Sequence, residues 1–560
     1  MKNYRILTLL LLIVLSLTHC KKAMIPPVKA PFDNVDKYAI NDWWNYAAKV
    51  RGTKSMILDL EVPRDEVVCF GIYTTHKKVL KLTAQLFPLY PDETREVRLE
   101  LKKDGNWIEV ASQKVNDIGW STTFRIENWD ETNNVPYRLR HGENAVFEGL
   151  IRKDPINKNE ISAALLSCNS NKDRGMREEF SRNINYLDPD VVFFVGDQSY
   201  DHKEHTAAWL LFGLQFREVF RNRPCVTMPD DHDIGQYNLW GEGGKKASSM
   251  TGDDGGYFFS PEYVKMVERC QTAHLPDPYD PIPVKQGIGV YYTNFLVGGI
   301  DFAIIEDRKF KSGPKGKIPQ QGPRPDHIID SNYDPKSIDL EGLTLLGERQ
   351  LKFLQDWGQN YEGVAIKSVV SATGFCGGAH RHGKFENYLH ADLDCNGWPQ
   401  TGRNKALRLL ADAGAVHLAG DQHLATLVQH GIDEYRDGPF AFVSPAIVNT
   451  IYRRWWHPLD EKSGNNKDPK NPLEFTGDYQ DGLGNKITMH AYANVEGPEK
   501  LNDGFGFIRF NKKEKSVKFE SWARFTDVTK KEAKEMEGWP RTIYRNDSDE
   551  SMTWTIDTLK

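Results

Sequence analysis

The pattern of apolar and polar positions divides the chain into two parts near residue 156. Between residues 53 and 155, short runs of alternating apolar and polar residues are separated by turn residues. Such alternation is typical of strands with one buried face, and the Asp-Gly pair within KDGNW (residues 103–107) favours a tight hairpin turn. The pattern therefore predicts a small antiparallel β-sandwich over residues 53–155.

After residue 156, apolar runs alternate with amphipathic segments. The run VVFFV (191–195) is apolar throughout, as in a strand buried on both faces. It follows a helical pattern over residues 175–187, and a second helical pattern over 344–361 precedes further apolar runs. Strands that alternate with helices predict a layered α/β domain over residues 156–530, with 531–560 as a C-terminal extension.

The N-terminus carries a different pattern. Lys2 and Arg5 precede the short apolar run 6–17, and Cys20 follows it. This order predicts an export signal over residues 1–20, because the run is too short to span a bilayer comfortably. LSLTHCKK resembles a bacterial lipobox, so we expect lipidation of Cys20, with ordinary cleavage or an uncleaved anchor as alternatives. Residues 21–52 would then form a linker segment.

Composition narrows the class of protein. The 560 residues are 39% hydrophobic and 27% charged, as in a soluble globular protein, and the length calls for two domains. A net charge of -6 gives no sign of a nucleic-acid-binding patch. Export permits disulfides, and Cys376 and Cys395, which flank one loop, are candidates for a pair.

Polar groups of one chemical kind follow several strands of the second domain. One predicted strand ends on Cys168, and a second is followed by Asp197 and Tyr200. Two more are followed by DDHD (230–233) and by GDQH (420–423). Layered α/β folds bind ligands at the carboxyl ends of their strands. Thiol, phenol, carboxylate and imidazole groups gathered at such ends predict a metal site.

The donor types indicate which ions such a site prefers. Thiolate, phenolate and imidazole suit a Lewis-acidic transition metal, and the two anionic donors favour Fe³⁺. Asp231 and Asp421 offer only hard oxygens, which suit Ca²⁺, Mg²⁺ or Mn²⁺. Asp197 lies between the two sets and is a candidate bridge. Two metals about 3.5–4 Å apart form the usual clamp for displacement at phosphorus.

In this order, LLSCN, GDQSY, DDHD and AGDQH resemble the signature of the alkaline phosphatase D (PhoD) family, within the calcineurin-like metallophosphoesterase superfamily. The resemblance covers roughly residues 162–523. The sandwich before it resembles the accessory domain of that family, which is fibronectin III-like. The fold that the resemblance implies is a layered α/β metallophosphoesterase-type β-sandwich flanked by helices.

The resemblance also implies roles for individual residues. The metal ligands would be Cys168, Asp197, Tyr200, Asp231, Asp421 and His423, with Asp197 shared by both ions. His232 would protonate or stabilise the leaving oxygen. The implied metals are Fe³⁺ and Ca²⁺, and Mg²⁺, Mn²⁺ or Zn²⁺ remain open for the second position.

Some polar groups support weaker interpretations. Arg308 matches the Asp-x-Arg segment of the family and is expected to bind a phosphoryl oxygen, with an ion pair to Asp307 or Glu306 as the alternative. The loop 374–400 contains His380, His382 and His390. It is expected to form a lid over the site, with a separate zinc site as the alternative. His417 lies inside a strand and fits a core histidine. Arg453 begins RRWWHP, which fits packing or a sugar or base subsite.

The sequence therefore predicts an exported, metal-dependent phosphoesterase. It would hydrolyse phosphomonoesters or phosphodiesters, small or polymeric, by attack of a metal-activated hydroxide. Contact with a membrane would come through the lipid anchor alone. The alternative is a surface glycan-binding lipoprotein on a catalytically degenerate phosphatase scaffold, which the 14 Trp and 22 Tyr favour slightly.

Overall fold

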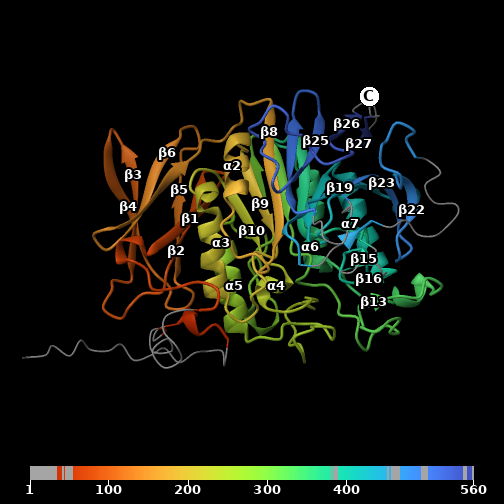
Figure 1. The fold of residues 1–560 in the computed structure, drawn as a ribbon, viewed down its shortest axis with the longest axis horizontal. Coiled ribbons are helices and arrows are strands. Elements are labelled where there is room, and N and C mark those ends of the chain that lie inside the picture. The colour runs from red at the N-terminus through yellow and green to blue at the C-terminus, as the bar shows by residue number, and fades with distance from the viewer. Residues whose placement is uncertain are drawn as a thin grey trace, which may run out of the picture.

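The computed structural model describes residues 35–40, 43, 55–379, 381–382, 389–450, 453–455, 467–493, 502–546 and 552–557. The predicted signal segment, Cys20 and most of the 21–52 segment lie outside the described residues. Figure 1 shows an all-β block at the N-terminal side of a larger block that contains most of the helices.

Within these described ranges, the helices are all too short or too polar to cross a bilayer.

The N-terminal block consists of two antiparallel sheets that share one apolar core. Its first sheet has the order β1-β2-β5 and its second the order β4-β3-β6-β7. The strands are β1 (Val68–His76), β2 (Val79–Leu86), β3 (Glu96–Lys103), β4 (Asn106–Lys114), β5 (Ser121–Glu127), β6 (Val135–His141) and β7 (Ala145–Ile151). The predicted hairpin is present, because Lys103 pairs with Asn106 around Asp104 and Gly105, whose φ angles are 51° and 82°. The all-β prediction for this region is confirmed.

Two eight-stranded sheets form the larger block and pack against each other. The first has the order β10-β9-β8-β24-β25-β26-β27, with β20 beside β8. Its strands are β8 (Glu160–Asn169), β9 (Val191–Val195), β10 (Cys225–Met228), β20 (Ala446–Val448), β24 (Gly504–Asn511), β25 (Ser516–Ala523), β26 (Arg541–Asn546) and β27 (Thr553–Ile556). Residues 531–560, set apart by the sequence as an extension, thus supply two strands of this sheet.

The second sheet has the order β11-β12-β14-β17-β19-β18-β23-β22. Its strands are β11 (Thr293–Val297), β12 (Ile300–Ile304), β14 (Ile366–Thr373), β17 (Val416–Gly420), β18 (Thr426–His430), β19 (Phe440–Val443), β22 (Gly477–Gln480) and β23 (Lys486–Tyr492). Side chains from both sheets, such as Phe193 and Phe302 with ring centroids 4.8 Å apart, fill the core between them. Two two-stranded ladders lie outside the sheets, β13 (His327–Ile328) with β16 (Ala391–Asp392) and β15 (Arg381–His382) with β21 (Arg453–Arg454).

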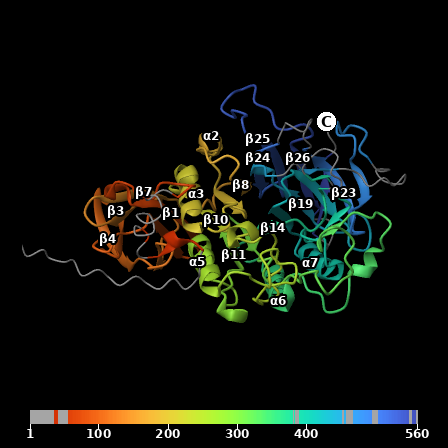
Figure 2. The same cartoon turned by 60° about the horizontal axis from the view of Figure 1, so that its bottom comes forward.

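Helices cover the outer faces of both sheets (Figure 2). The first sheet packs on α2 (Glu178–Leu187) and α3 (His205–Phe220), and the second on α6 (Gly347–Gln359) and α7 (Gln400–Asp412). The short α4 (Asp231–Ile234) and α5 (Pro261–Thr272) follow β10. The chain therefore has the helix-flanked, layered α/β sandwich that the sequence predicted.

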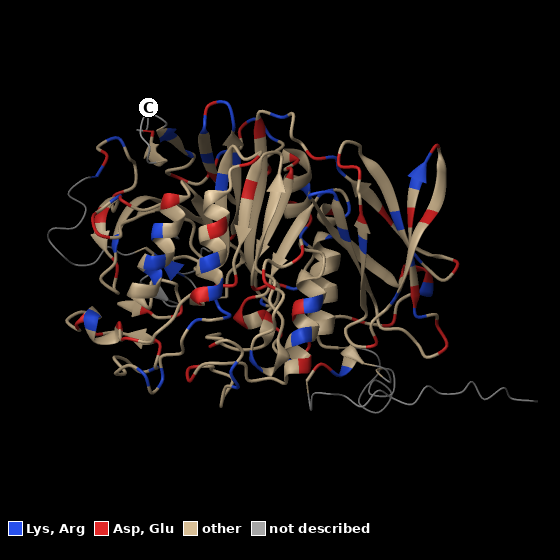
Figure 3. Cartoon of the chain, turned by 180° about the vertical axis from the view of Figure 1, so that it is seen from behind, with Lys and Arg blue, Asp and Glu red and all other residues tan. Residues whose placement is uncertain are grey.

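Charged residues are distributed over both blocks. In Figure 3, Lys and Arg alternate with Asp and Glu along the helices and loops of the face in view. Several charged side chains are also buried near the carboxyl ends of β9, β10 and β12, among them Asp197, Asp230 and Arg308. These buried charges mark the candidate site.

Candidate metal centre

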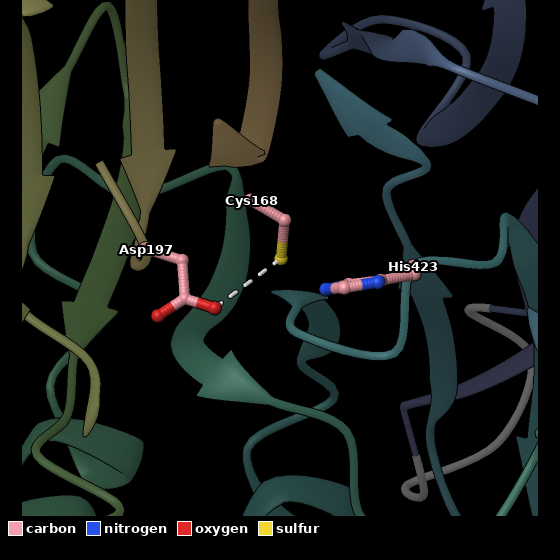
Figure 4. Close-up of side chains that lie close together, drawn as sticks. All are labelled: Cys168, Asp197 and His423. Carbon is pink, nitrogen blue, oxygen red and sulfur yellow. Dashed lines mark hydrogen bonds between the residues drawn. The ribbon is translucent and has the colours of Figure 1, made fainter. Parts of the chain in front are cut away.

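The candidate ligands lie where the carboxyl ends of parallel strands meet. Strands β8, β9 and β10 run parallel in the first sheet, and β14, β17 and β19 run parallel in the second. Their carboxyl ends lead into Cys168, Asp197, Asp231 and Asp421. Figure 4 shows Cys168, Asp197 and His423 converging from three separate strand ends.

Several of these residues have a left-handed backbone. The φ angles are 59° at Cys168, 58° at Asp197, 61° at Asp421 and 54° at His423. A non-glycine residue in this region costs roughly 1–2 kcal/mol. Such conformations persist where the surrounding structure enforces them, and they cluster at functional sites.

The first group of donors combines sulfur, oxygen and nitrogen. Ligand atoms of Cys168, Asp197 and His423 all lie within 4.8 Å of one another. The Tyr200 hydroxyl donates to Asp197 Oδ2 at 2.7 Å and lies 2.9 Å from His423 Nε2. The structure therefore brings together the thiol, carboxylate, phenol and imidazole that the sequence assigned to one ion.

Two further groups share Asp197. One contains Asp197, Asp231 and His232, and the other contains Asp197, Asp230 and Asp421. Asp197 thus belongs to all three groups, the position expected of a bridging carboxylate. Asp230 lies closer to this centre than the sequence reasoning anticipated, since only Asp231 of the DD pair was assigned a ligand role.

The buried acidic groups of the centre favour the binding of a cation. Burial raises the pKa of Asp197 well above its usual range, and the neighbouring Asp230, Asp233 and Asp421 raise it further. Burial likewise raises the pKa of the Cys168 thiol and the Tyr200 phenol. Asp197 Oδ1 is buried without a hydrogen-bond partner. An unpartnered oxygen among anionic groups fits a metal ligand, because a bound cation reverses these penalties.

Arg308 is hydrogen-bonded to carboxylates of the centre. Its Nε donates to Asp230 Oδ1 at 2.7 Å and its Nη1 to Asp394 Oδ1 at 2.5 Å, while Nη2 lies 3.5 Å from Asp421. The side chain is buried. The alternative of an ion pair with Asp307 or Glu306 is wrong in its partners, because the ion pairs of Arg308 are with Asp230, Asp394 and Asp421. Its expected contact with a phosphoryl oxygen stays a prediction.

His232 stands at the edge of the centre and is held by other rings. Its Nδ1 is hydrogen-bonded to His202 Nε2, and the two rings stack with centroids 4.8 Å apart. The centroid of the Tyr200 ring lies 4.1 Å from the centroid of the His232 ring. Burial lowers the pKa of His232 well below its usual value, and the nearby His202, His423 and Arg308 add to this shift.

Asp233 is a functional residue that the sequence reasoning left without a role. Its carboxylate accepts the backbone N–H groups of Asp197 at 2.8 Å, Gln198 at 3.0 Å and Asp230 at 3.0 Å. It thereby ties the turn after β9 to the turn after β10. The signal lay in the DDHD run itself, where the fourth residue is also acidic.

Asp421 has supporting partners from β14. Thr373 Oγ1 donates to Asp421 Oδ2 at 2.5 Å and Gln422 Nε2 donates to the same oxygen at 2.8 Å. The backbone of Thr373 is fixed in turn by Asp307 Oδ2, which accepts its N–H at 3.0 Å. These contacts join the carboxyl ends of β12, β14 and β17.

The loop 374–400 differs from its prediction in one respect. Cys376 and Cys395 are both free thiols, so they form no disulfide. The Cys395 sulfur instead lies 3.1 Å from the Asp392 carbonyl oxygen. His380 lies outside the described residues, and of His382 only the backbone is described. Asp392 forms a group with Asp326 and His327, in which Arg324 already pairs with Asp326 at 2.7 Å.

His417 is confirmed as a core histidine. It is fully buried in β17, and its Nε2 lies 2.6 Å from Ser371 Oγ. Burial lowers its pKa to about 3. It is therefore neutral and plays a packing role in the sheet.

Comparisons with known proteins place the fold. No family model and no curated protein sequence matches the chain. Among solved structures, PhoD matches with a TM-score of 0.58 and 12% identity, over 89% of this chain and 94% of that chain. The purple acid phosphatase PPD1 from seeds of yellow lupin (Lupinus luteus) matches with a TM-score of 0.52 and 12% identity, over 86% of this chain and 75% of that chain. The chain therefore shares the fold of PhoD and of this purple acid phosphatase.

Proposed function

We propose that this protein is a metal-dependent phosphoesterase. The observation that carries the proposal is the position of Asp197, whose carboxylate belongs to three candidate donor groups at once. A carboxylate shared between two ions is what a two-metal phosphoester site requires. The fold of PhoD and of a purple acid phosphatase supports the same reaction class. A degenerate scaffold that only binds glycans is disfavoured, because every assigned donor lies at the centre.

The donor sets favour different ions at the two positions. Cys168, Tyr200 and His423 would hold Fe³⁺ together with Asp197, since thiolate and phenolate stabilise a ferric ion. Asp231 and Asp421 would hold Ca²⁺ with the same bridge, since their oxygens are hard donors. Mg²⁺, Mn²⁺ or Zn²⁺ are alternatives for this second position.

The residues of this chain would divide the work of ester hydrolysis. Bound metal ions supply Lewis acidity and lower the pKa of water. His232 would give a proton to the leaving alcohol oxygen as the P–O ester bond breaks, and its hydrogen bond to His202 orients the ring for this step. Arg308 keeps Asp230 and Asp394 paired, so that excess negative charge at the centre does not repel the phosphate ester.

The test is a hydrolysis assay on metal-analysed protein. We expect turnover of p-nitrophenyl phosphate, of bis(p-nitrophenyl) phosphate or of both, with a rise on addition of Ca²⁺. The protein should also be coloured by an iron–phenolate absorption band, which Tyr200→Phe should abolish. Fully metal-loaded protein that hydrolyses neither ester would exclude the proposed function, and colourless active protein without iron would exclude only the ferric ion.

We also propose that the protein is exported and carried on the membrane by lipid at Cys20, and that its substrates are small or polymeric phosphate esters. Lys2, Arg5 and the apolar run 6–17 support this localisation. Cys20→Ser should release the protein from membranes or block its maturation. Unchanged fractionation and migration of that variant would contradict lipidation.

A further inference from the structure

Arg453 lies on a segment that leaves the edge of the metal centre. Strand β20 runs parallel to the end of β8, where Ala446 pairs with Ser167 and Val448 with Asn169, the two neighbours of Cys168. Five residues after Val448 the chain forms β21, in which Arg453 pairs with His382 of β15. Strand β21 therefore follows closely in the chain on the strand that lies beside the end of β8.

The guanidinium of Arg453 is near the centre but engages none of its groups. Arg453 is half-buried, its Nε is buried without a partner, and in the described part of the chain no hydrogen bond or ion pair reaches its guanidinium. Burial lowers the pKa of Arg453, but the charges of Asp421, Asp392 and Asp394 outweigh it and leave that pKa raised. Its charge acts on His232 in turn.

The two arginines of the centre therefore differ in availability. Arg308 donates hydrogen bonds to the carboxylates of Asp230 and Asp394, with N···O distances of 2.7 and 2.5 Å. Arg453 is influenced by the charges of Asp421, Asp392 and Asp394, and among the described residues no hydrogen bond or ion pair engages its guanidinium. A partly buried guanidinium without an anion is costly unless a ligand supplies one.

We propose that Arg453 binds the phosphoryl oxygens of the substrate, opposite the metal ligands. The planar fork of a guanidinium matches the spacing of two phosphoryl oxygens, and a charge-assisted bidentate contact is among the strongest hydrogen-bonded contacts in proteins. This inference rests on the proposed function and assigns a substrate-binding residue to it.

The experiment measures phosphate affinity as well as turnover. Arg453→Gln should raise KM for p-nitrophenyl phosphate, and raise the dissociation constant of inorganic phosphate measured by calorimetry, each by about 10–100-fold, since tenfold corresponds to about 1.4 kcal/mol. Arg453→Lys should recover part of the loss, because it keeps the charge without the fork. Metal content and the absorption spectrum should match the wild type in both variants.

A matched control separates this effect from a general loss of positive charge. Arg408→Gln removes an exposed arginine on α7 that pairs with Asp433, and it should leave KM and phosphate affinity unchanged. Unchanged KM and phosphate affinity in Arg453→Gln, with an active wild type, would overturn the role of Arg453 alone. A fully metal-loaded wild type that neither hydrolyses esters nor binds phosphate would overturn both the proposed function and this role.

Discussion

Asp231 and His232 are adjacent residues to which the proposed mechanism gives different tasks. Both belong to one donor group with Asp197. His232 also has a hydrogen bond to His202 and a ring contact with Tyr200, which fix its orientation without a metal. A positioned proton donor and a metal ligand respond differently to removal, so substitution distinguishes them.

We expect Asp231→Ala and Asp421→Ala to lower both metal stoichiometry and rate. His232→Ala should keep the metals and lose about 10²–10⁴-fold in rate, the usual contribution of a positioned acid–base group. The loss should be smaller for a nitrophenyl ester than for an alkyl ester, since nitrophenolate leaves without much protonation. Metal analysis and rates on both esters measure this. Loss of metal from His232→Ala, with equal rate losses on both esters, would make His232 a ligand.

The residue types at the strand ends could be predicted from the sequence, but their hydrogen-bond partners could not. Cys168, Asp197 and His423 lie at or soon after the carboxyl ends of β8, β9 and β17, and parallel topology gathers such ends at one edge of each of the two sheets. The contacts of Arg308 with Asp230 and Asp394 join positions 78 and 86 residues away. No local pattern encodes such separations, and the same holds for the position of Arg453.

At the level of secondary structure elements, Asp233 connects two loops of the centre. Its carboxylate is buried and accepts three backbone N–H groups from the turns after β9 and β10. Gln271 Nε2 from α5 adds a fourth contact at 3.2 Å. A side chain that bonds to backbone at both turns sets the distance between Asp197 and Asp231.

Asp233→Asn should therefore loosen both turns. An amide offers one oxygen and presents N–H to a backbone donor, and each buried donor left unpaired costs about 1–3 kcal/mol. We expect a lower free energy of unfolding and weaker metal retention during dialysis. The control is Asp339→Asn, because Asp339 also accepts a backbone N–H, from Thr401, but this hydrogen bond is exposed and lies outside the centre. Equal effects of the two variants would remove the positioning role.

Burial of His417 in β17 makes the sheet sensitive to acid. The pKa of His417 is about 3 in the folded protein and about 6.5 in an unfolded chain. Between these values the unfolded state binds a proton that the folded state does not, so stability falls as pH falls below 6.5.

Relative to His417→Gln, the free energy of unfolding of the wild type should fall by about 1.6 kcal/mol between pH 6.5 and pH 5, since the slope approaches 1.36 kcal/mol per pH unit only well below 6.5. Urea unfolding of both proteins at the two pH values measures the difference. A difference between wild type and variant that stays constant with pH would mean that folding leaves the pKa of His417 unchanged.

On the scale of the whole molecule, α3 joins the N-terminal sandwich to the larger block. Phe70 of β1 packs on α3. The centroid of its ring lies 5.5 Å from that of Trp209 and 5.4 Å from that of Phe220. Gly213 lies beneath this ring, and a Cβ there would be 2.1 Å from Phe70 Cε1. Only a glycine lets the sheet approach the helix this closely.

Gly213→Ala should destabilise the protein although alanine favours helices. The helix gains about 1 kcal/mol, but the clash with a buried aromatic ring costs about 1–3 kcal/mol and moves the two blocks apart. Gly358→Ala on α6 is the control, because its nearest neighbour, Ala413 Cβ, would be 3.3 Å away. Thermal unfolding should show a lower Tm for Gly213→Ala and an unchanged or higher Tm for Gly358→Ala. Equal Tm values would show that the two blocks adjust without cost.

The left-handed backbone of Cys168, Asp197, Asp421 and His423 has a consequence for protein engineering. Glycine adopts this conformation without penalty, and asparagine tolerates it better than most residues. A library selected only for heat resistance would therefore favour glycine or asparagine at these four positions, and at Asp197 and Asp421 the replacement also removes a buried carboxyl group. Screening for stability without screening for activity would replace the candidate metal ligands first and leave the surrounding sandwich intact.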